Sequence, residues 1–287
     1  MNFILGTAQF GLNYGVSNIY GKTQEHEVKK ILDTALLNGF RKIDTAIDYG
    51  DCESVLGKTG IKQFEVITKI NPQNIQGNNA FSMILSDVEN SLRKLKIDQL
   101  EAILIHNTET IVNGNEEDIF HFLNDLKKMK LTKKIGISSY SSKEIIRLCG
   151  KYDFDIAQTP LNIIDTDLIT SGCIETLKKS KVEVHVRSIF LQGLLLMKEE
   201  HRPKKFDQFN SIWNEWHKWL NKNDLTPLEG CLCFINNCLL IDGVVIGVEN
   251  SAQLIDIVKS TNRSVSSMPN FPKIDPMLLN PAKWASL

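Results

Sequence analysis

The chain has 287 residues, of which 42% are hydrophobic and 23% are charged, and its formal net charge is −1 at pH 7. This length and composition are typical of a soluble globular protein built as one large domain. A charge so near zero gives no reason to expect nucleic acid or an acidic membrane as a partner, and no apolar run approaches the roughly 20 residues that span a bilayer. Met1–Gly6 lacks the basic start of a secretory signal, so we expect a cytoplasmic protein.

Short apolar runs rich in β-branched residues alternate with segments of helical periodicity, as in parallel strands connected by helices. The second predicted strand ends at Asp44. The other predicted strands, in chain order, are Phe3–Thr7, Phe64–Lys69, Leu100–His106, Lys134–Ser139, Ile156–Thr159, Val182–Ser188 and Gly243–Ile246. Eight such units predict a (β/α)8 barrel that forms a single domain over residues 1–287.

The helices are predicted from apolar residues spaced three and four positions apart. The segment after the first strand is rich in Gly and Asn and is predicted to be a loop. Thr23 and Ser141 are predicted to cap two of the helices, the second over Ser142–Cys149. The remaining helices are predicted from Glu53 onward, within Phe81–Leu95, along Ile119–Met129, near Ile174–Lys181, and over Phe206–Leu220, Leu228–Leu239 and Ala252–Lys259.

Two segments are assigned to packing. Four prolines interrupt Arg263–Leu287, which is predicted to be an irregular tail that packs on the barrel. Cys231, Cys233 and Cys238 form the one cysteine cluster that resembles a metal site, but their C-x-C spacing is unusual for zinc and no His is near. We therefore expect no metal, and we interpret these cysteines as core residues of an apolar helix.

Four polar residues stand where apolar runs end: Asp44 and Tyr49 after the second strand, Lys69 at the end of the third and His106 at the end of the fourth. Each alone has an ordinary explanation, such as a solvated strand end or a packed ring. The carboxyl ends of barrel strands converge on one mouth, however, so an acid, a phenol, an ammonium and an imidazole would meet there. This combination predicts a site of proton transfer and therefore an enzyme.

A series of segments resembles the aldo-keto reductases. It includes G-T-A-Q-F-G (6–11), D-T-A-I-D-Y-G-D-C-E-S-V-L-G (44–57), V-I-T-K (66–69) and L-I-H-N (104–107). It continues with I-G-I-S-S (135–139), Q-T-P-L-N (158–162), Q-G-L-L (192–195) and V-I-G-V-E-N-S-A-Q-L (245–254). The resemblance implies a barrel that binds extended NADP(H) or NAD(H) without a Rossmann fold, in agreement with the lack of a G-x-G-x-x-G motif.

The resemblance also implies roles for the four polar residues. Tyr49 would give a proton to the substrate oxygen while hydride comes from the cofactor, and His106 would donate a hydrogen bond to the same oxygen. Lys69, held by Asp44, is expected to lower the pKa of Tyr49. The substrate would be an aldehyde or ketone, with a sugar-derived compound as one candidate, or the corresponding alcohol.

The cofactor positions implied by the resemblance lie at several strand ends. Gly6, Thr7 and Ala8 match a loop near the nicotinamide ribose, and Arg187 stands where many members stack a tyrosine on the nicotinamide. Gly247–Gln253 matches the adenosine phosphate segment, and its Glu249 and Gln253 leave a preference for NADP in doubt because an acid repels a 2′-phosphate. The other positions, with Asp44, are Ser138, Ser139, Gln158, Ser188 and Asn250.

Alternatives remain open from the sequence. The chain could be a regulatory or scaffold subunit that binds nicotinamide nucleotide with little turnover, or a lyase that forms a Schiff base on Lys69. The loops 13–18 and 194–207 are expected to form part of the substrate rim. Their polar residues suit a hydroxylated or anionic substrate: Asn13, Tyr14, Lys198, His201 and Arg202. We expect a monomer or a weak homo-oligomer.

Overall fold

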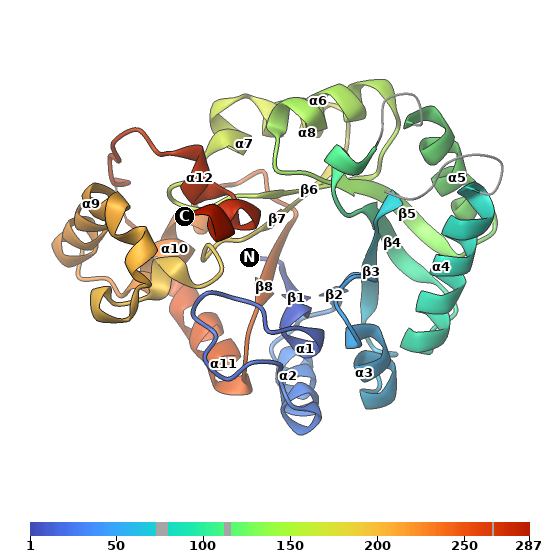
Figure 1. Ribbon diagram of the computed structural model, residues 1–287, viewed down its shortest axis with the longest axis horizontal. Coiled ribbons are helices and arrows are strands. Elements are labelled where there is room, and N and C mark those ends of the chain that lie inside the picture. Colours follow the sequence, from blue (N-terminus) through green and yellow to red (C-terminus); the bar gives the residue numbers. More distant parts are fainter. Residues whose placement is uncertain (73–79, 112–115, 266) are drawn as a thin grey trace.

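Eight parallel strands close into a barrel in the computed structural model, which describes residues 1–72, 80–111, 116–265 and 267–287 (Figure 1). Each strand pairs with its neighbours in chain order, and β8 closes the ring against β1. The strands are β1 (Phe3–Gly6), β2 (Lys42–Asp44), β3 (Glu65–Ile70), β4 (Leu100–Ile105), β5 (Thr132–Ser138), β6 (Ile156–Pro160), β7 (Glu183–Arg187) and β8 (Gly243–Gly247). The predicted (β/α)8 barrel is thus confirmed.

Helices surround the barrel on its outside (Figure 1). The longer ones are α2 (Glu25–Leu37), α3 (Cys52–Thr59), α4 (Ala80–Leu95), α5 (Glu116–Lys128), α6 (Ser142–Lys151), α8 (Cys173–Lys179), α9 (Asn210–Lys222), α10 (Pro227–Asn236) and α11 (Ser251–Lys259). Single turns of α-helix form α1 (Ala8–Gly11), α7 (Asp167–Thr170) and α12 (Pro276–Leu279). The 3-10 helices are η2 (Thr108–Thr110), η3 (Leu194–Leu196), η4 (Glu199–His201), η5 (Lys204–Phe209), η6 (Ser260–Asn262) and η7 (Pro281–Ser286).

Two local predictions at the start of the chain are wrong. The loop expected after β1 contains α1, which is held in place because Phe10 is fully buried. Thr23 does not cap α2, since the residue before the helix is Gln24 and no side chain caps it. The Thr23 hydroxyl instead donates to the Glu249 carbonyl oxygen at 3.5 Å, which links the start of α2 to the loop after β8. The Ser141 cap of α6 is confirmed, because its Oγ accepts from the Glu144 N–H.

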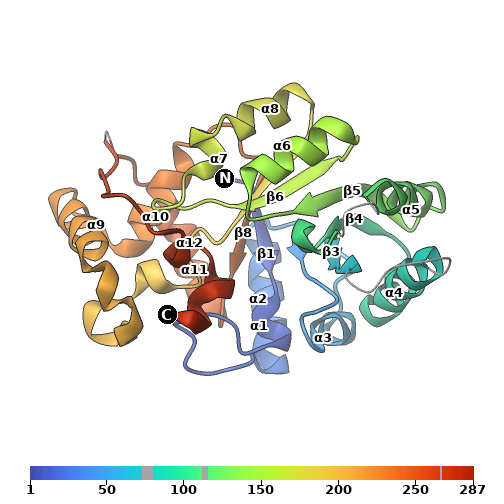
Figure 2. The same ribbon diagram turned by 45° about the horizontal axis from the view of Figure 1, so that its top comes forward.

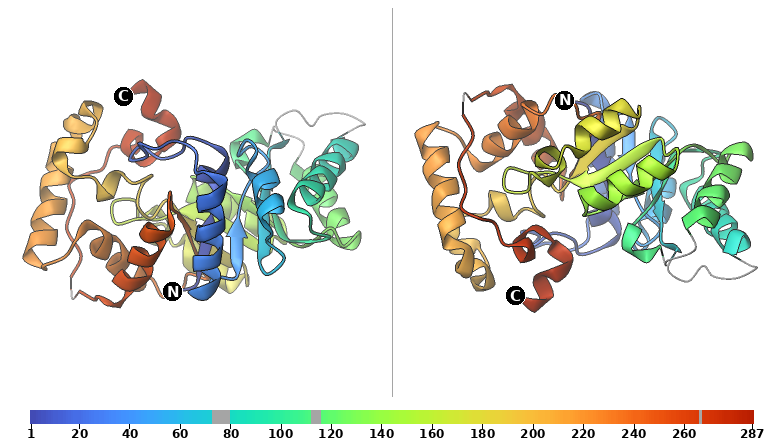
Figure 3. Two further views of the ribbon diagram at one scale, coloured as in Figure 1. Left: turned by 90° about the horizontal axis from the view of Figure 1, so that it is seen from below. Right: turned by 90° about the horizontal axis from the view of Figure 1, so that it is seen from above.

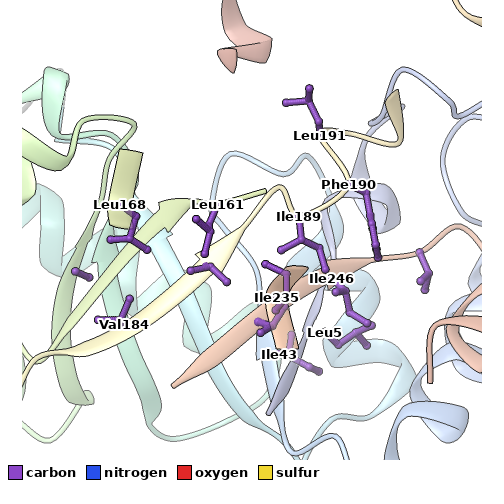
Figure 4. Packing of buried hydrophobic residues seen from close by; sticks show 14 of the residues in the cluster. Leu5, Ile43, Leu161, Leu168, Val184, Ile189, Phe190, Leu191, Ile235 and Ile246 are labelled. Carbon is purple, nitrogen blue, oxygen red and sulfur yellow. The ribbon is translucent and has the colours of Figure 1, made fainter. Parts of the chain in front are cut away.

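Apolar side chains fill both sides of the strands. Leu5 on β1 is in register with Ile43 on β2 and with Ile246 on β8, and all three belong to the large core between strands and helices (Figure 4). A smaller cluster contains Ile4, Ile67, Ala102, Leu104 and Ile156. Alternate residues of one strand thus belong to separate clusters, as the two-residue period of a strand requires.

The predicted aromatic helix is a packing element. Trp213, Trp216 and Trp219 of α9 are buried, and each indole N–H donates to a backbone carbonyl oxygen. The helices α9 and α10 lie together at one side of the molecule (Figure 2). On α10, Cys231 and Cys233 are buried in the core, as the sequence predicts.

The last described residues lie at the mouth of the barrel. Figure 3 shows α12 and η7 at the end that carries the loop after β1, opposite the N-terminus. The buried indole of Trp284 packs edge-on against Phe206, and Lys205 Nζ donates to the Trp284 carbonyl oxygen at 2.7 Å. In the part of the chain that the structure describes, no helix is both long and apolar enough to cross a bilayer.

Candidate active site

A chain of buried polar groups connects three strands below the mouth. Lys69 Nζ on β3 donates to Asp44 Oδ1 at the end of β2, at 2.5 Å, and to the Thr45 carbonyl oxygen at 3.0 Å. Gln158 Nε2 on β6 donates to the other oxygen, Asp44 Oδ2, at 2.8 Å. The three side chains are almost completely inaccessible, so each must find its partners inside the protein. Burial lowers the pKa of Lys69, and the attached Asp44 carboxylate opposes that change.

The segment between Asp44 and α3 carries Tyr49 and is fixed by close backbone contact with α1. A Cβ on Gly11 would lie 1.8 Å from the Tyr49 carbonyl oxygen, so only glycine allows this approach. Gly50 has a φ of +59°, which also favours glycine. Cys52 Sγ donates to the Thr7 carbonyl oxygen at 3.2 Å. The backbone that supports Tyr49 is therefore held against the end of β1.

Tyr49 lies between a cation and an imidazole. Its ring meets His106 edge to face with a centroid separation of 5.6 Å, and Lys69 Nζ is 5.3 Å from the Tyr49 centroid. Burial raises the pKa of Tyr49, the Asp44 charge raises it further, and Arg187 is the cation that opposes them. The sequence predicts a lowered pKa for Tyr49, whereas the pKa is raised overall because burial and the Asp44 charge outweigh the nearby cations. The phenol is therefore protonated at neutral pH.

His106 follows β4 and faces the same space. Burial lowers its pKa to about 4, and the Lys69 charge acts in the same direction. Its Nδ1 lies 3.3 Å from Asp48 Oδ2, and the neutral ring has a single N–H that can stand on either nitrogen. With that proton on Nε2, the imidazole and the neutral phenol beside it can each donate a hydrogen bond to one oxygen atom and can stabilise negative charge that develops on it.

A cavity of about 250 Å³ begins at Asp44 and Tyr49 and extends along the ends of β1 and β8 to the start of α11. Ten of the residues that the sequence assigns to the site line it: Gly6, Thr7, Ala8, Asp44, Tyr49, Arg187, Ser188, Gly247, Glu249 and Gln253. The first helical turn of α11 and the loops after β1, β2, β7 and β8 thus contribute to one elongated space.

The other assigned residues do not line this cavity. Lys69 and Gln158 lie behind Asp44, and His106 lies beside Tyr49. Ser138 ends β5 and is buried, and the Ser139 hydroxyl accepts from Thr108 and from the Ser141 N–H. The side chain of Asn250 caps α11 by accepting from the Gln253 N–H at 2.9 Å.

Residues of the rim loops also line the cavity. Tyr14 and Ser17 come from the loop after β1, and Gln192 comes from the loop after β7. These loops touch, because Val16 N–H donates to the Gln192 carbonyl oxygen at 3.1 Å and the Gln192 side chain donates to the Tyr14 hydroxyl at 3.3 Å. The Gly- and Asn-rich sequence indicated the first loop, but nothing in the sequence indicated its contact with the second.

Other lining residues were not assigned to the site from the sequence. They include Gln9 on α1, Phe190 after β7 and Asp256 on α11. The Q-G-L-L segment that follows Leu191 was a signal for the β7 loop, whereas Asp256 was hidden in an ordinary helical pattern.

Part of the predicted rim lies elsewhere. Lys198, His201 and Arg202 do not line the cavity. The Arg202 guanidinium stacks on Trp213 at 4.5 Å and its Nη2 contacts His217 Nε2 at 3.1 Å, so this arginine serves the packing of α9. Its assignment to the rim is wrong because the guanidinium packs on α9.

One buried hydrogen-bond acceptor beside the cavity lacks a partner in the part of the chain that the structure describes. Gln158 Oε1 is buried and has no hydrogen-bond partner among the described residues, although its amide nitrogen is bonded to Asp44. An acceptor left in this state is a cost that an N–H donor would remove. At the cavity wall, a Cβ on Gly247 would lie 2.7 Å from the Gln9 side chain, so a larger residue here would displace that side chain.

The chain is similar to known proteins over its whole barrel. The model of the aldo/keto reductase family matches residues 2–276. Methylglyoxal reductase DkgB of Escherichia coli O157:H7 is 32% identical over 114 residues, which are 38% of this chain and 41% of that protein, less than half of its length. Aldo-keto reductase YhdN of Bacillus subtilis strain 168 is 25% identical over 242 residues, which are 75% of this chain and 70% of the relative.

Solved structures share the fold. Aldo-keto reductase AKR11C1 from Bacillus halodurans superimposes with a TM-score of 0.73 at 20% identity, covering 93% of this chain and 88% of that one. Glycerol dehydrogenase AKR11B4 from Gluconobacter oxydans gives a TM-score of 0.72 at 18% identity, covering 92% and 88%. Because the family model spans nearly the whole barrel and the same fold recurs in these structures, the chain belongs to the aldo/keto reductase family.

Proposed function

We propose that the protein is an NAD(P)H-dependent oxidoreductase that reduces an aldehyde or ketone to an alcohol. The observation that carries the proposal is the cavity that begins at the Tyr49 phenol, beside a neutral His106, and ends at Glu249 and Gln253. Such a space suits an extended dinucleotide whose reactive ring lies next to a proton donor. A methylglyoxal reductase and a glycerol dehydrogenase among the similar proteins agree with carbonyl and alcohol chemistry.

In this proposal Tyr49 is the general acid. Its raised pKa keeps the phenol protonated, and the alkoxide that develops on the substrate is a stronger base than the phenolate, so the proton moves to the substrate oxygen. His106 donates to the same oxygen and stabilises its charge. A nicotinamide cofactor held in this cavity would supply the hydride. Lys69 and Asp44 fix the floor of the site, and Lys69, buried and paired, is poorly placed to form a Schiff base.

The residues that would hold the cofactor extend along the cavity. Gln158 and Ser138 would take the carboxamide, and the face of Arg187 would take the nicotinamide ring. Ser139 and Asp44 complete this end of the site, and Gly6, Thr7, Ala8 and Ser188 would lie along the ribose and phosphate. Gly247, Glu249, Asn250 and Gln253 would hold the adenosine end.

The adenosine end of the cavity carries acids. Glu249 and Asp256 line it, and the described lining residues include no Lys or Arg there. Gln253 Oε1 accepts from the Glu249 N–H at 2.8 Å and keeps this loop in place. A carboxylate repels a 2′-phosphate and accepts from a ribose hydroxyl, so we propose a small NADPH advantage or none.

Cofactor binding tests the proposal directly. Titration of the protein with NADH and with NADPH, followed by nicotinamide fluorescence, should give saturable binding of at least one, and the bound enzyme should reduce simple aldehydes. Calorimetry that detects no binding of either at millimolar concentration would rule the proposal out. Binding without turnover of any aldehyde would favour the regulatory subunit instead. Sedimentation of the same sample should report a monomer or a weak oligomer.

A further inference from the structure

We propose that Arg187 binds an anionic group of the substrate, so that the preferred carbonyl compounds carry a carboxylate close to the aldehyde or ketone. This inference rests on the proposed function, because it assumes that the carbonyl is placed at Tyr49. Arg187 ends β7 and lines the cavity together with Tyr49 and Tyr14. Among the described residues of the lining it is the one Lys or Arg.

No carboxylate of the described residues forms an ion pair with Arg187. Its guanidinium lies 4.2 Å from the centre of the Tyr140 ring, and its Nη1 makes a long contact with Ser188 Oγ at 3.4 Å. No carboxylate of the described residues is within 4.0 Å of it. By contrast, the nearby ammonium of Lys69 is balanced by Asp44 at 2.5 Å.

The two tyrosines that line the cavity with Arg187 remain neutral at pH 7. Burial raises the pKa of Tyr14 to about 12, and burial also raises the pKa of Tyr49. Burial raises the pKa of Asp165 to about 6, so this carboxyl is largely ionised at pH 7, and the Arg187 charge acts on it although the two groups form no ion pair within 4.0 Å. A partly buried cation without a counter-ion is costly, and an anion that enters beside it removes that cost.

Guanidinium geometry favours a carboxylate. The five N–H donors of arginine lie in one plane and match the two oxygens of a carboxylate in a bidentate pair. The guanidinium carbon lies 4.2 Å from the centre of the Tyr140 ring. A flat ring would use a face of the guanidinium plane and an anion would use its N–H edge, so both proposed contacts of Arg187 are compatible.

The position of Arg187 indicates a substrate group in preference to a cofactor phosphate. Its charge acts on the phenol of Tyr49 and the imidazole of His106, the two groups placed to meet the carbonyl oxygen. The far end of the cavity, by contrast, is acidic at Glu249 and Asp256. An anion held by Arg187 would therefore lie near the carbonyl.

Matched aldehydes can test this assignment. The 2-, 3- and 4-carboxybenzaldehydes and their methyl esters share the aldehyde and ring and differ in charge. For the wild-type protein, kcat/KM for at least one acid should exceed that for its ester by about 10- to 100-fold, mainly through KM, as expected of a charge-assisted hydrogen bond. The advantage should shrink as salt is raised, which needs no variant.

Two variants and a control locate the effect. Arg187→Gln should bring the ratio of acid to ester close to one, and Arg187→Lys should keep part of the preference. Arg41→Gln removes the same charge from an exposed arginine before β2 that donates to the Leu36 and Phe40 carbonyl oxygens, and it should leave the ratio unchanged.

Other outcomes would overturn the inference. If wild-type protein reduces acids no better than esters, the substrate anion is absent although the proposed function stands. If Arg187→Gln weakens NADH and NADPH binding equally and leaves the ratio of acid to ester unchanged, the arginine binds a cofactor phosphate. If no aldehyde is reduced and neither cofactor binds, the proposed function itself has failed.

Discussion

Tyr49 combines a raised pKa with a position beside two other functional groups. The hydroxyl is kept neutral by burial and by the Asp44 charge, while Lys69 is held away in its own ion pair. A raised pKa makes this phenol a weaker acid than an exposed tyrosine, so it gives up its proton only to a strong base such as a developing alkoxide. The Lys69–Asp44 pair beneath it keeps two buried charges balanced.

Replacing Tyr49 tests this role. Tyr49→Phe removes only the hydroxyl, so packing should survive and turnover should fall by roughly 100-fold or more, the scale of a lost acid catalyst. Stopped-flow and steady-state rates would measure the loss, with the dissociation constant for NADPH as the control that should be nearly unchanged. Lys69→Met should also abolish most turnover, and the double variant should be little worse than either. Reduction by Tyr49→Phe at close to the wild-type rate would show that the proton comes from another group.

Glu249 controls cofactor choice in the proposed function. Glu249→Lys replaces a repulsive carboxylate with a cation, so the affinity for NADPH should rise by more than that for NADH. Fluorescence titration with both cofactors gives the ratio of the two dissociation constants. Glu200→Lys makes the same charge change on an exposed residue of η4 outside the cavity and should leave the ratio as it was. If the ratio of dissociation constants in Glu249→Lys is the same as in the wild type, this loop does not meet the 2′-phosphate.

The sequence placed single side chains at strand ends far better than it described their environment. Asp44, Lys69 and Tyr49 were found because each terminates or follows an apolar run. The pKa of the Tyr49 phenol was misjudged, since burial and ion pairing depend on neighbours from β2 and β6 that are distant in sequence. Tyr14 and Gln192 meet through loops whose shape no local pattern encodes.

Strands and long helices were predictable because their apolar residues have a regular period. The turn of α1 was missed because its Gly-rich sequence is typical of a loop, and it forms only because Phe10 has a buried place to occupy. Thr23 does not cap α2, because its hydroxyl donates instead to the Glu249 carbonyl oxygen in the loop after β8. In both places a tertiary contact outweighed the local preference.

Two glycines within helices allow a matched test of packing between elements. Gly57 on α3 meets α4 so closely that a Cβ would lie 1.9 Å from the Lys94 carbonyl oxygen, whereas a Cβ on Gly150 of α6 would meet nothing within 4 Å. Gly57→Ala should therefore lower the free energy of unfolding by about 1–3 kcal/mol, the usual cost of overpacking. Gly150→Ala should raise it by about 0.5–1 kcal/mol through helix propensity. Urea unfolding measures both, and a change of the same sign in both variants would contradict the close packing of α3 on α4.

The whole molecule should be less stable in acid because of His106. Its pKa is about 4 in the folded chain and 6.5 without its surroundings, so the unfolded chain binds more protons between these values. The contribution of His106 to the free energy of unfolding is complete above pH 6.5 and is lost as the pH falls toward 4. Between pH 7 and pH 5 this loss is about 2 kcal/mol.

The variant His106→Asn isolates this contribution. Asp165 acts in the opposite direction, because its raised pKa makes folding easier as the pH falls, so the wild-type slope alone would mix the two groups. The difference in unfolding free energy between wild type and His106→Asn should shift by about 2 kcal/mol from pH 7 to pH 5, with wild type losing more. A constant difference would mean that the imidazole is as basic when folded as when unfolded.

The Cys52 thiol is hydrogen-bonded to Thr7 and Thr45, and we expect its burial to protect it from reaction with carbonyl compounds. Aldehydes and dicarbonyls are electrophiles that add to thiolates, and this thiol lies just behind the segment that carries Tyr49. Burial raises its pKa to about 11, so at pH 7 only about one molecule in ten thousand holds the reactive anion. An enzyme that handles reactive carbonyl compounds would in this way escape modification by its own substrates. Intact-mass measurement after incubation with excess dicarbonyl should find Cys52 unmodified in folded protein and modified once urea exposes it.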